Sequence, residues 1–388
     1  MRDGQFMIGR MRLVVIPWLC ALAVPAGCAG VSTDPEAMAA RELPAAGPGV
    51  DAAAVATDET EALRLLAAES YSEAVETARS VLERDPRRAR ARSVFALALL
   101  RSSPEQGPAP MAIQSAADGE SLTALRLAPA DPVVGLVRGR VLAEIGHLSA
   151  AATAAEDCLK LSAATDLPEF LDLLAATAEW AHELGEDRRA LVHLRELASR
   201  RPSDSLAHYR LGTCLLRIAS NGDDAAAASR AFARCAELEP ESQDTRAAVV
   251  AALVRAAELY ESDGEAEKAR AQLVAAASAA TLIKERFPNS AAAAFQLAAV
   301  CELQGELKQA VEAYEGALQL DAEHLPSLLN LLSCATRQRD AYAEICRSAP
   351  RMPTQSTLLD RTLAVDAAKG GLSDAERTKL EKLRASLR

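Results

Sequence analysis

Aromatic side chains are scarce in this sequence. They make up 3% of its 388 residues, although half of the residues are hydrophobic, and alanine supplies a large share of that half. A β-rich protein needs aromatic and β-branched residues on its strands, whereas alanine is the residue that loses least side-chain entropy in a helix. The composition therefore excludes a β-rich protein and predicts an all-α fold.

Positive charge is also in deficit. The chain carries 43 Lys and Arg against 54 Asp and Glu, which gives a formal net charge of −11 at pH 7. A protein that binds nucleic acid needs a basic face to neutralise phosphates. We therefore expect no nucleic-acid partner.

The sequence motifs of common catalytic and metal sites are missing. There is no P-loop, no dinucleotide-binding glycine motif, and no HExxH, GxSxG or CxxC. The five histidines show no ligand spacing to one another. His182 stands beside Trp180 and Glu183 on an expected helix, but the second histidine of a helical metal motif is absent. We interpret His182 as a surface histidine, and we expect no enzyme activity, no metal and no cofactor.

A single long apolar run stands near the N-terminus. LVVIPWLCALAV, residues 13–24, follows a head with three arginines and one aspartate and precedes PAGCAG. The run is shorter than the roughly 20 residues that span a bilayer. A basic head, a short apolar run and small residues are typical of a secretory signal, which we assign to residues 1–28. The protein is therefore expected to be exported.

The end of this signal resembles the lipobox of bacterial lipoproteins. In a lipobox, small residues precede a cysteine that is lipidated and becomes the mature N-terminus. Ala26, Gly27 and Cys28 match this pattern, whereas Pro25 stands where the family usually has leucine. The resemblance implies a membrane anchor at Cys28, in the outer membrane if the source is Gram-negative. The alternative is ordinary cleavage beside Cys28, which would give a soluble periplasmic protein.

One stretch shows a helix with small residues at a regular spacing. LKQAVEAYEGALQLD, residues 307–321, sets Ala310 and Ala317 around Tyr314, without a proline break. Together with the residues before it, this stretch resembles the tetratricopeptide repeat (TPR), which places two helices in 34 residues, with a glycine between them and A-x3-F/Y in the second helix. Residues 291–324 fit the repeat, and Gly305 marks the turn.

The same spacing recurs along the chain. In five of the units, a proline stands twelve residues after the alanine anchor, at positions 86, 129, 202, 240 and 288. Alanine suits such anchors because paired helices that approach to about 8–10 Å need small side chains at their closest contact. The seven anchors are Ala74, Ala117, Ala151, Ala190, Ala228, Ala276 and Ala310.

The repeats lead to a prediction for the whole chain. We expect a flexible Ala/Pro/Gly linker over residues 29–58 and a TPR solenoid over 59–350. The fold class is all-α, a right-handed solenoid of about seven to eight antiparallel helix pairs. Its sixth pair should be elongated and should turn at Asp263–Gly264. Residues 351–388 should form capping helices, because SDAE at 373–376 reads as a capping box.

The eight cysteines do not suggest a disulfide framework. Cys158 and Cys235 take the repeat position that Ala124 and Ala317 occupy, where a thiol behaves as a small buried apolar group. Most pairs are separated by whole repeats, which is farther than the few ångströms a disulfide bridges. Cys334 with Cys346 is the least implausible pair.

The resemblance also implies where a partner would bind. In tetratricopeptide proteins the first helix of each pair lines a concave groove that holds a peptide or protein. Carried onto this chain, that register implies a set of first-helix residues. The alternative is that Tyr209 and Phe295 pack between repeats and that the arginines are solvated. The groove residues are Arg140, Glu179, His182, Tyr209, Leu216, Arg217, Arg255 and Phe295.

The function that follows is a non-catalytic scaffold. We expect a lipid-anchored cell-envelope protein that binds a protein or peptide in its groove, in pilus, secretion or cell-wall assembly. A soluble periplasmic TPR module is the first alternative. An enzyme with a site in the elongated sixth unit is the second.

Overall fold

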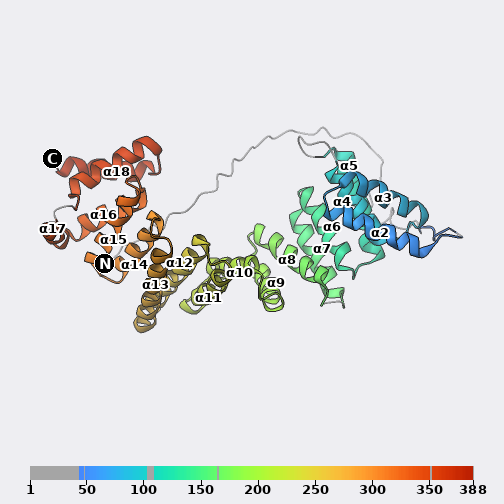
Figure 1. Cartoon of the computed structure of the whole chain (residues 1–388), viewed down its shortest axis with the longest axis horizontal. Helices are drawn as coiled ribbons and strands as arrows, with labels where there is room; N and C mark the ends of the chain where they lie inside the picture. Colours follow the sequence, from blue (N-terminus) through green and yellow to red (C-terminus); the bar gives the residue numbers. More distant parts are fainter. Residues whose placement is uncertain (1–42, 48, 103–108, 164–165, 350–351, 388) are drawn as a thin grey trace, which may run out of the picture. The chain divides into compact units, whose positions relative to one another are not determined.

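The computed structural model describes residues 43–47, 49–102, 109–163, 166–349 and 352–387 (Figure 1). These residues form eighteen α-helices and no strand, and all of the helices lie in one compact unit, Pro44–Arg388. The all-α prediction is confirmed. The predicted signal, including Cys28, and half of the predicted linker lie outside the described residues.

Fourteen of the helices form seven consecutive pairs, in which each first helix packs on the second helix that follows it. The first helices are α2 (Ala52–Ala67), α4 (Ala89–Arg101), α6 (Pro132–Glu144), α8 (Pro168–Glu183), α10 (Ser205–Ile218), α12 (Gln243–Ser262) and α14 (Ala291–Leu303). The second helices are α3 (Tyr71–Arg84), α5 (Met111–Leu127), α7 (Leu148–Leu161), α9 (Asp187–Arg200), α11 (Gly222–Leu238), α13 (Ala266–Arg286) and α15 (Leu307–Leu320).

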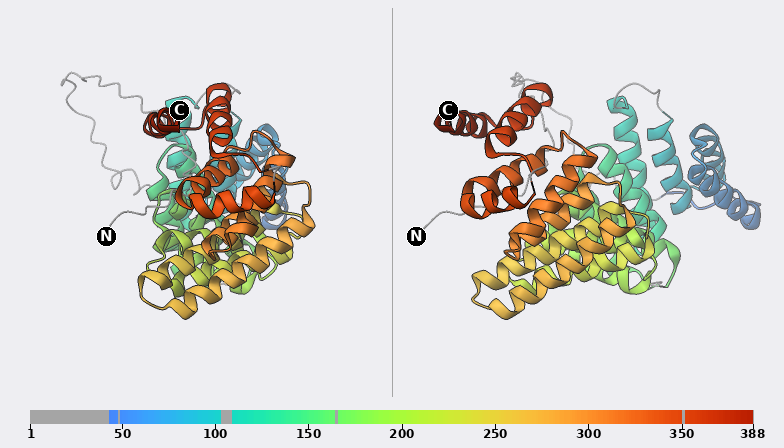
Figure 2. Two further views of the ribbon diagram at one scale, coloured as in Figure 1. Left: turned by 90° about the vertical axis from the view of Figure 1, so that its left-hand side faces the viewer. Right: turned by 60° about the vertical axis from the view of Figure 1, so that its left-hand side comes forward.

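The pairs stack on one another in chain order, as Figure 2 shows. Each second helix also packs on the first helix of the next pair, so that a first helix lies between two second helices. First helices pack on one another as well, as α4 does on α6 and α6 on α8. This is the packing of a helical-repeat solenoid, in which one pair buries its apolar face only against its neighbours.

The alanine anchors occupy the closest contacts of this stack. All seven lie on second helices, and each has a relative exposure of 0%. Tyr314 fills the space beside the last anchor and is itself fully buried. Its hydroxyl donates to Glu302 at 2.7 Å and accepts from Asn330 at 2.8 Å. The predicted repeat register is confirmed, because the small residues stand where helices meet.

Glycines on the helices receive the few large aromatic rings. A Cβ built on Gly139 of α6 would lie 2.2 Å from Trp180 of α8. Gly212 has the same relation to the ring of Phe232, at 2.8 Å. Real side chains do not approach so closely, so these rings pack directly on helix backbone. A small number of aromatic residues is therefore enough for this fold.

Most turns within the pairs depend on a residue with positive φ. Gly146, Gly185, Gly264 and Gly305 stand between first and second helices with φ between 76° and 89°. The elongated sixth pair turns at Asp263–Gly264 as predicted, between helices of 20 and 21 residues. In the first pair the same position holds Glu69, at φ 59°. A side chain at such φ is strained, which makes Glu69 the exception in the series.

The first helix begins seven residues earlier than the sequence analysis predicts. Residues 52–58 were assigned to the linker, but α2 starts at Ala52. Asp51 caps it by accepting from the backbone N–H of Ala53 and Ala54, at 2.9 and 3.3 Å. Val55, within the supposed linker, is 1% exposed. The alanine-rich composition that suggested a linker is equally a helix-forming composition once a cap is present.

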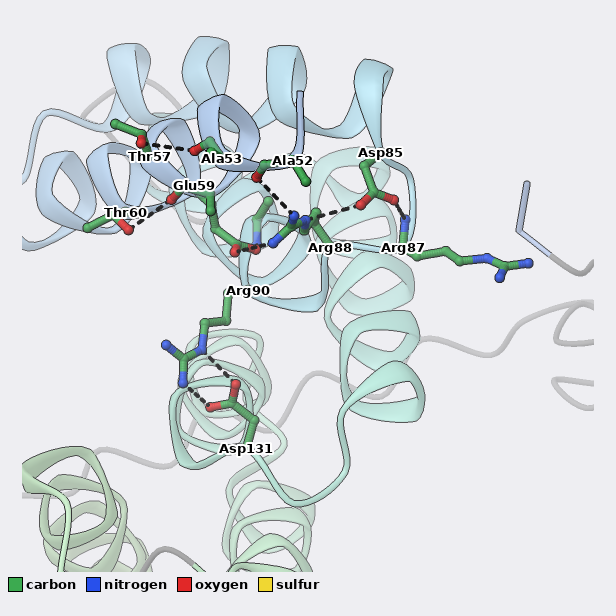
Figure 3. A network of polar contacts seen from close by, with 12 residues as sticks. Ala52, Ala53, Thr57, Glu59, Thr60, Asp85, Arg87, Arg88, Arg90 and Asp131 are labelled. Carbon is green, nitrogen blue, oxygen red and sulfur yellow. Dashed lines mark hydrogen bonds and ion pairs between the residues drawn. The ribbon is translucent and has the colours of Figure 1, made fainter. Parts of the chain in front are cut away.

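Polar contacts attach this early helix to the second pair (Figure 3). Glu59 on α2 accepts from the backbone N–H of Ala91 at 3.1 Å, which supplies a partner at the start of α4. Arg88 lies 3.5 Å from Glu59 and 3.1 Å from Asp85. These contacts and the buried Val55 make α2 part of the repeat array.

Four helices follow the seventh pair, namely α16 (Leu325–Arg337), α17 (Arg339–Ser348), α18 (Gln355–Lys369) and α19 (Asp374–Leu387). Leu358 and Leu359 of α18 belong to the same apolar core as Tyr314 and Leu328. The predicted boundary at residue 350 therefore does not separate two cores. The capping box is present, since Glu376 accepts from the backbone N–H of Ser373 at 2.8 Å.

Candidate functional site

The residues predicted to contact a partner share one location. All eight lie on first helices, from α6 to α14. We call the exposed side of α4, α6, α8, α10, α12 and α14 the first-helix face. Their environments differ, and these differences decide which side chains are available to a partner.

Two of the eight residues pack inside the repeat array. The ring of Phe295 lies 5.8 Å from that of Tyr314 and 5.5 Å from that of His324, and Phe295 is partly buried. Leu216 packs against two apolar clusters around α10 and α11. The structure therefore places these two side chains in inter-repeat packing, which is the alternative that the sequence analysis left open for Phe295.

Tyr209 has an exposed ring surface. It is 38% exposed, and its ring meets that of Phe232 edge-on, with 5.5 Å between the two ring centroids. Its orientation is therefore held by packing while much of its area faces solvent. Arg255 is exposed and pairs with Glu258 on its own helix, at 3.0 Å.

Arg140 is exposed and has no direct partner among the residues that the structure describes. Its neighbours are engaged: Arg101 pairs with Glu144, and Glu179 pairs with Arg210, each at 2.5 Å. Arg140 itself makes no hydrogen bond or ion pair with the described residues. Although the residue as a whole is exposed, neighbouring helices partly desolvate its guanidinium, and this desolvation, followed by the charge of Arg101, lowers the pKa of Arg140. An arginine in this position can donate hydrogen bonds to a carboxylate of another molecule, because its N–H groups have no acceptor among the described residues.

His182 is not the solvated surface residue that the sequence suggested. Its Nδ1 lies 2.9 Å from Oδ1 of Asp187 and 3.4 Å from Sγ of Cys214. Asp187 is 6% exposed and Cys214 is fully buried. Arg217 is another predicted groove residue. Its Nε forms an ion pair with the second carboxylate oxygen of Asp187, at 3.1 Å. Arg217 is therefore tied to a buried carboxylate and is less available to a partner than its exposure suggests.

This arrangement does not activate Cys214 as a nucleophile. In a nucleophilic triad the acid and the nucleophile contact different nitrogens of the imidazole, whereas here Asp187 and Cys214 share Nδ1. Burial, with a smaller contribution from Asp187, raises the pKa of Cys214 to about 12. The thiol is therefore protonated at neutral pH. All six described cysteines are free, so Cys334 and Cys346 are not joined in this structure.

An open apolar groove lies on the other side of the array. It has a volume of about 890 Å³ and is lined by Leu122 and Leu125 of α5 and by Leu148 and Leu161 of α7. Leu142 of α6 contributes to the same lining. The sequence analysis missed this groove because the apolar residues of α5 and α7 are individually unremarkable. The groove arises from the separation of the two second helices.

None of the described helices is both long and apolar enough to cross a bilayer.

Comparisons with known proteins find similarity to other helical-repeat proteins. The family model of the soluble NSF attachment protein, SNAP, matches residues 174–332, less than half of the chain. No curated protein gives a significant match.

Three solved structures illustrate the similarity of fold. YrrB, described as a TPR protein with an unusual peptide-binding site, has 15% identity and a TM-score of 0.41, covering 54% of this chain and 96% of YrrB. MamA from Desulfovibrio magneticus RS-1 has 17% identity and a TM-score of 0.39, covering 52% and 97%. PilF from Pseudomonas aeruginosa has 16% identity and a TM-score of 0.41, covering 65% and 97%.

The helix pairs define the class of protein. Seven buried alanine anchors and the position of each first helix between two second helices make the chain an all-α solenoid of TPR-like repeats. Such arrays present extended surfaces for other proteins. The fold is that of a protein-interaction scaffold.

Proposed function

We propose that this protein is a cell-envelope scaffold that binds a segment of a partner protein on its first-helix face. A lipid on Cys28 would hold it at a membrane, and the partner would take part in envelope assembly, such as that of a pilus, a secretion complex or the cell wall. The residue pattern around Cys28 supports the anchor, and the exposed residues of the first-helix face support the partner site.

Two side chains of the first-helix face support the partner site: an arginine without a bond in the described chain, and an exposed aromatic ring. Arg140 on α6 makes no direct bond within the described chain, and Tyr209 on α10 exposes a ring that Phe232 orients. A few residues dominate the binding energy of a protein interface, and tyrosine and arginine are enriched among them. A segment that crosses α6, α8 and α10 would place a carboxylate at Arg140 and an apolar side chain against Tyr209.

The test compares three forms of the full chain as bait for envelope extract. Truncation of an interface anchor commonly costs about 2 kcal/mol, or roughly thirtyfold in affinity. We expect the Arg140→Ala, Tyr209→Ala double variant to lose proteins that the wild type captures. Glu312→Ala changes an exposed residue of a second helix, α15, and should capture the same proteins as the wild type.

Circular dichroism must show equal helicity in all three forms. A folded double variant that captures its partner as well as the wild type does would contradict the proposal. In that case the apolar groove between α5 and α7 becomes the surface to test. Arg217 and Phe295 are left unchanged in this experiment, because their contacts within the fold would confuse a loss of binding with a loss of stability.

A further inference from the structure

Three potential metal ligands meet where the fourth helix pair contacts the fifth. His182 stands at the end of α8, Asp187 is the first residue of α9 across the Gly185 turn, and Cys214 lies on α10. One ligand atom from each lies within 4.8 Å of the other two. We call these three residues the His182 cluster. The side chain of His182 is 26% exposed, whereas Asp187 and Cys214 are buried.

The spacing within the His182 cluster is close to that of a metal coordination sphere. Zinc binds nitrogen and oxygen at about 2.0–2.2 Å and sulfur at about 2.3 Å. Tetrahedral geometry then places neighbouring ligand atoms roughly 3.3–3.7 Å apart. The observed distances from Nδ1 of His182 are 2.9 Å to the carboxylate oxygen and 3.4 Å to the sulfur. The third pair, the Asp187 oxygen and the Cys214 sulfur, lies within 4.8 Å, so side-chain adjustment around a common centre would admit an ion.

We propose that the His182 cluster is a binding site for a zinc ion, with Nδ1 of His182, Oδ1 of Asp187 and Sγ of Cys214 as its protein ligands. Imidazole and thiolate favour zinc over the harder magnesium and calcium ions, which prefer oxygen. Three protein ligands leave a fourth position, which lies toward the exposed side of the imidazole and is filled by water.

Arg217 fits this site as an outer partner. Its Nε forms an ion pair with Oδ2 of Asp187 at 3.1 Å. Its Nη1 lies 3.5 Å from Nδ1 of His182, and Oδ1 of Asp187 lies 2.9 Å from the same nitrogen. Ligating carboxylates are commonly oriented by an outer polar partner, and Nη1 of Arg217 would turn away from Nδ1 of His182 as the ion binds. The Arg217 side chain is 49% exposed.

Protons and charge balance when the ion binds. Zn²⁺ displaces the proton of the Cys214 thiol, which passes to solvent, and a bond forms between zinc and the thiolate. Nδ1 of His182 binds the ion without a proton, so the neutral imidazole carries its proton on Nε2. Two ligand charges, from the thiolate and the carboxylate, then neutralise the divalent ion.

The ion would add a metal link between two helix pairs that already meet here through packing and through the ion pair of Arg217 with Asp187. His182 and Asp187 bracket the turn between α8 and α9, and Cys214 belongs to the next pair. A bond from all three to one ion fixes the turn against α10. Zinc would therefore stiffen the junction between the fourth and fifth pairs, independently of any partner on the first-helix face.

The experiment titrates the purified full chain with Co²⁺, a spectroscopic substitute for zinc, in a reductant that does not bind metals. A thiolate ligand produces a charge-transfer absorption in the near ultraviolet. We expect one cobalt per chain, loss of the absorption when zinc is added, and a higher melting temperature with zinc. Cys214→Ala and His182→Gln should each weaken binding beyond the roughly 10- to 100-fold that loss of an outer partner costs.

Cys235→Ala provides the matched control. Cys235 is a buried thiol of the neighbouring α11, outside the His182 cluster, and its loss should leave cobalt binding unchanged. A wild-type chain without the thiolate absorption would overturn the proposal, as would an absorption that survives in Cys214→Ala. If Cys214→Ala does not fold, His182→Gln decides, because it retains every thiol, and undiminished binding in that variant equally overturns the site.

Discussion

At the scale of single residues, contacts between glycine and aromatic rings distinguish this protein from a generic alanine-rich helical array. Gly139, Gly212 and Gly222 each support a ring that a Cβ would strike. Gly139 and Gly212 lie on first helices, where the repeat places small residues. The sequence could not indicate which ring contacts which glycine, since Trp180 comes from the following pair, 41 positions away in the printed sequence.

Gly139→Ala tests the closest of these contacts. The added Cβ would lie 2.2 Å from the buried indole of Trp180, which has no room to move aside. Overpacking of this kind costs about 1–3 kcal/mol. Gly316→Ala in α15 meets nothing within 4 Å and should gain up to about 1 kcal/mol from helix propensity. Urea denaturation measures both, and a common sign for the two variants would refute the contact.

At the scale of helices, caps and turns explain where the elements begin and end. Asp51, Asp131 and Asp204 each accept a hydrogen bond from the first turn of a helix. Such caps satisfy backbone donors that have no partner within the helix. The missed start of α2 shows the limit of composition. Whether an alanine-rich segment forms a helix depends on its cap and on packing against other segments of the chain, and composition shows neither.

Glu69→Gly should stabilise the first pair. Glu69 holds φ 59° where four other pairs have glycine. The left-handed conformation costs a side chain about 1–2 kcal/mol, and glycine returns about half of this through its greater freedom when unfolded. We therefore expect a gain of roughly 0.5–1 kcal/mol in urea denaturation. Glu73→Gly, inside α3, should lose about 1 kcal/mol. A loss in both variants would show that the turn is not strained.

Asp366 should make the C-terminal helices sensitive to acid. The carboxylate of this buried residue accepts from Arg377 of α19 at 2.7 Å and from the backbone N–H of Leu372 at 2.9 Å. The bond from Arg377, followed by that from Leu372, lowers the pKa of Asp366. A lowered pKa stabilises the fold at pH above the unfolded value of about 3.9, and this contribution is lost as pH falls below it.

Asp366→Asn should therefore be less stable than the wild type at neutral pH. The difference should shrink as the pH falls below about 3.9. Urea midpoints at several pH values measure it. Asp360→Asn removes an exposed pair with Arg384 and should change stability little at any pH. A difference for Asp366→Asn that is independent of pH would mean that the carboxylate charge is not what holds α19.

At the scale of the whole molecule, the repeat array presents several surfaces, and they have different uses. The first-helix face carries Arg140 and Tyr209, the second helices α5 and α7 border an apolar groove, and the His182 cluster links two pairs. Binding of a partner and binding of zinc are separate proposals, because Arg140 and Tyr209 do not belong to the His182 cluster. Each can fail without the other.

Cys28→Ser tests the proposed attachment to a membrane. If Cys28 is lipidated, the wild-type chain should sediment with membranes and its lipid-modified terminus should be visible by mass spectrometry. The variant should move to the soluble fraction. A mature chain that begins at Gly27 or Gly30 would contradict lipidation and would favour the soluble periplasmic module.

Composition and spacing were sufficient to predict the helices, their pairing and the seven buried anchors, because helix propensity and repeat period are local properties of the chain. Packing between distant segments settled the remainder. It placed Phe295 against Tyr314, paired Arg217 with Asp187, and left Arg140 without a bond to the residues that the structure describes. It also brought Cys214 to His182 across 32 positions. A search for adjacent ligands could not find that cluster, because its residues become neighbours only when one helix pair stacks on the next.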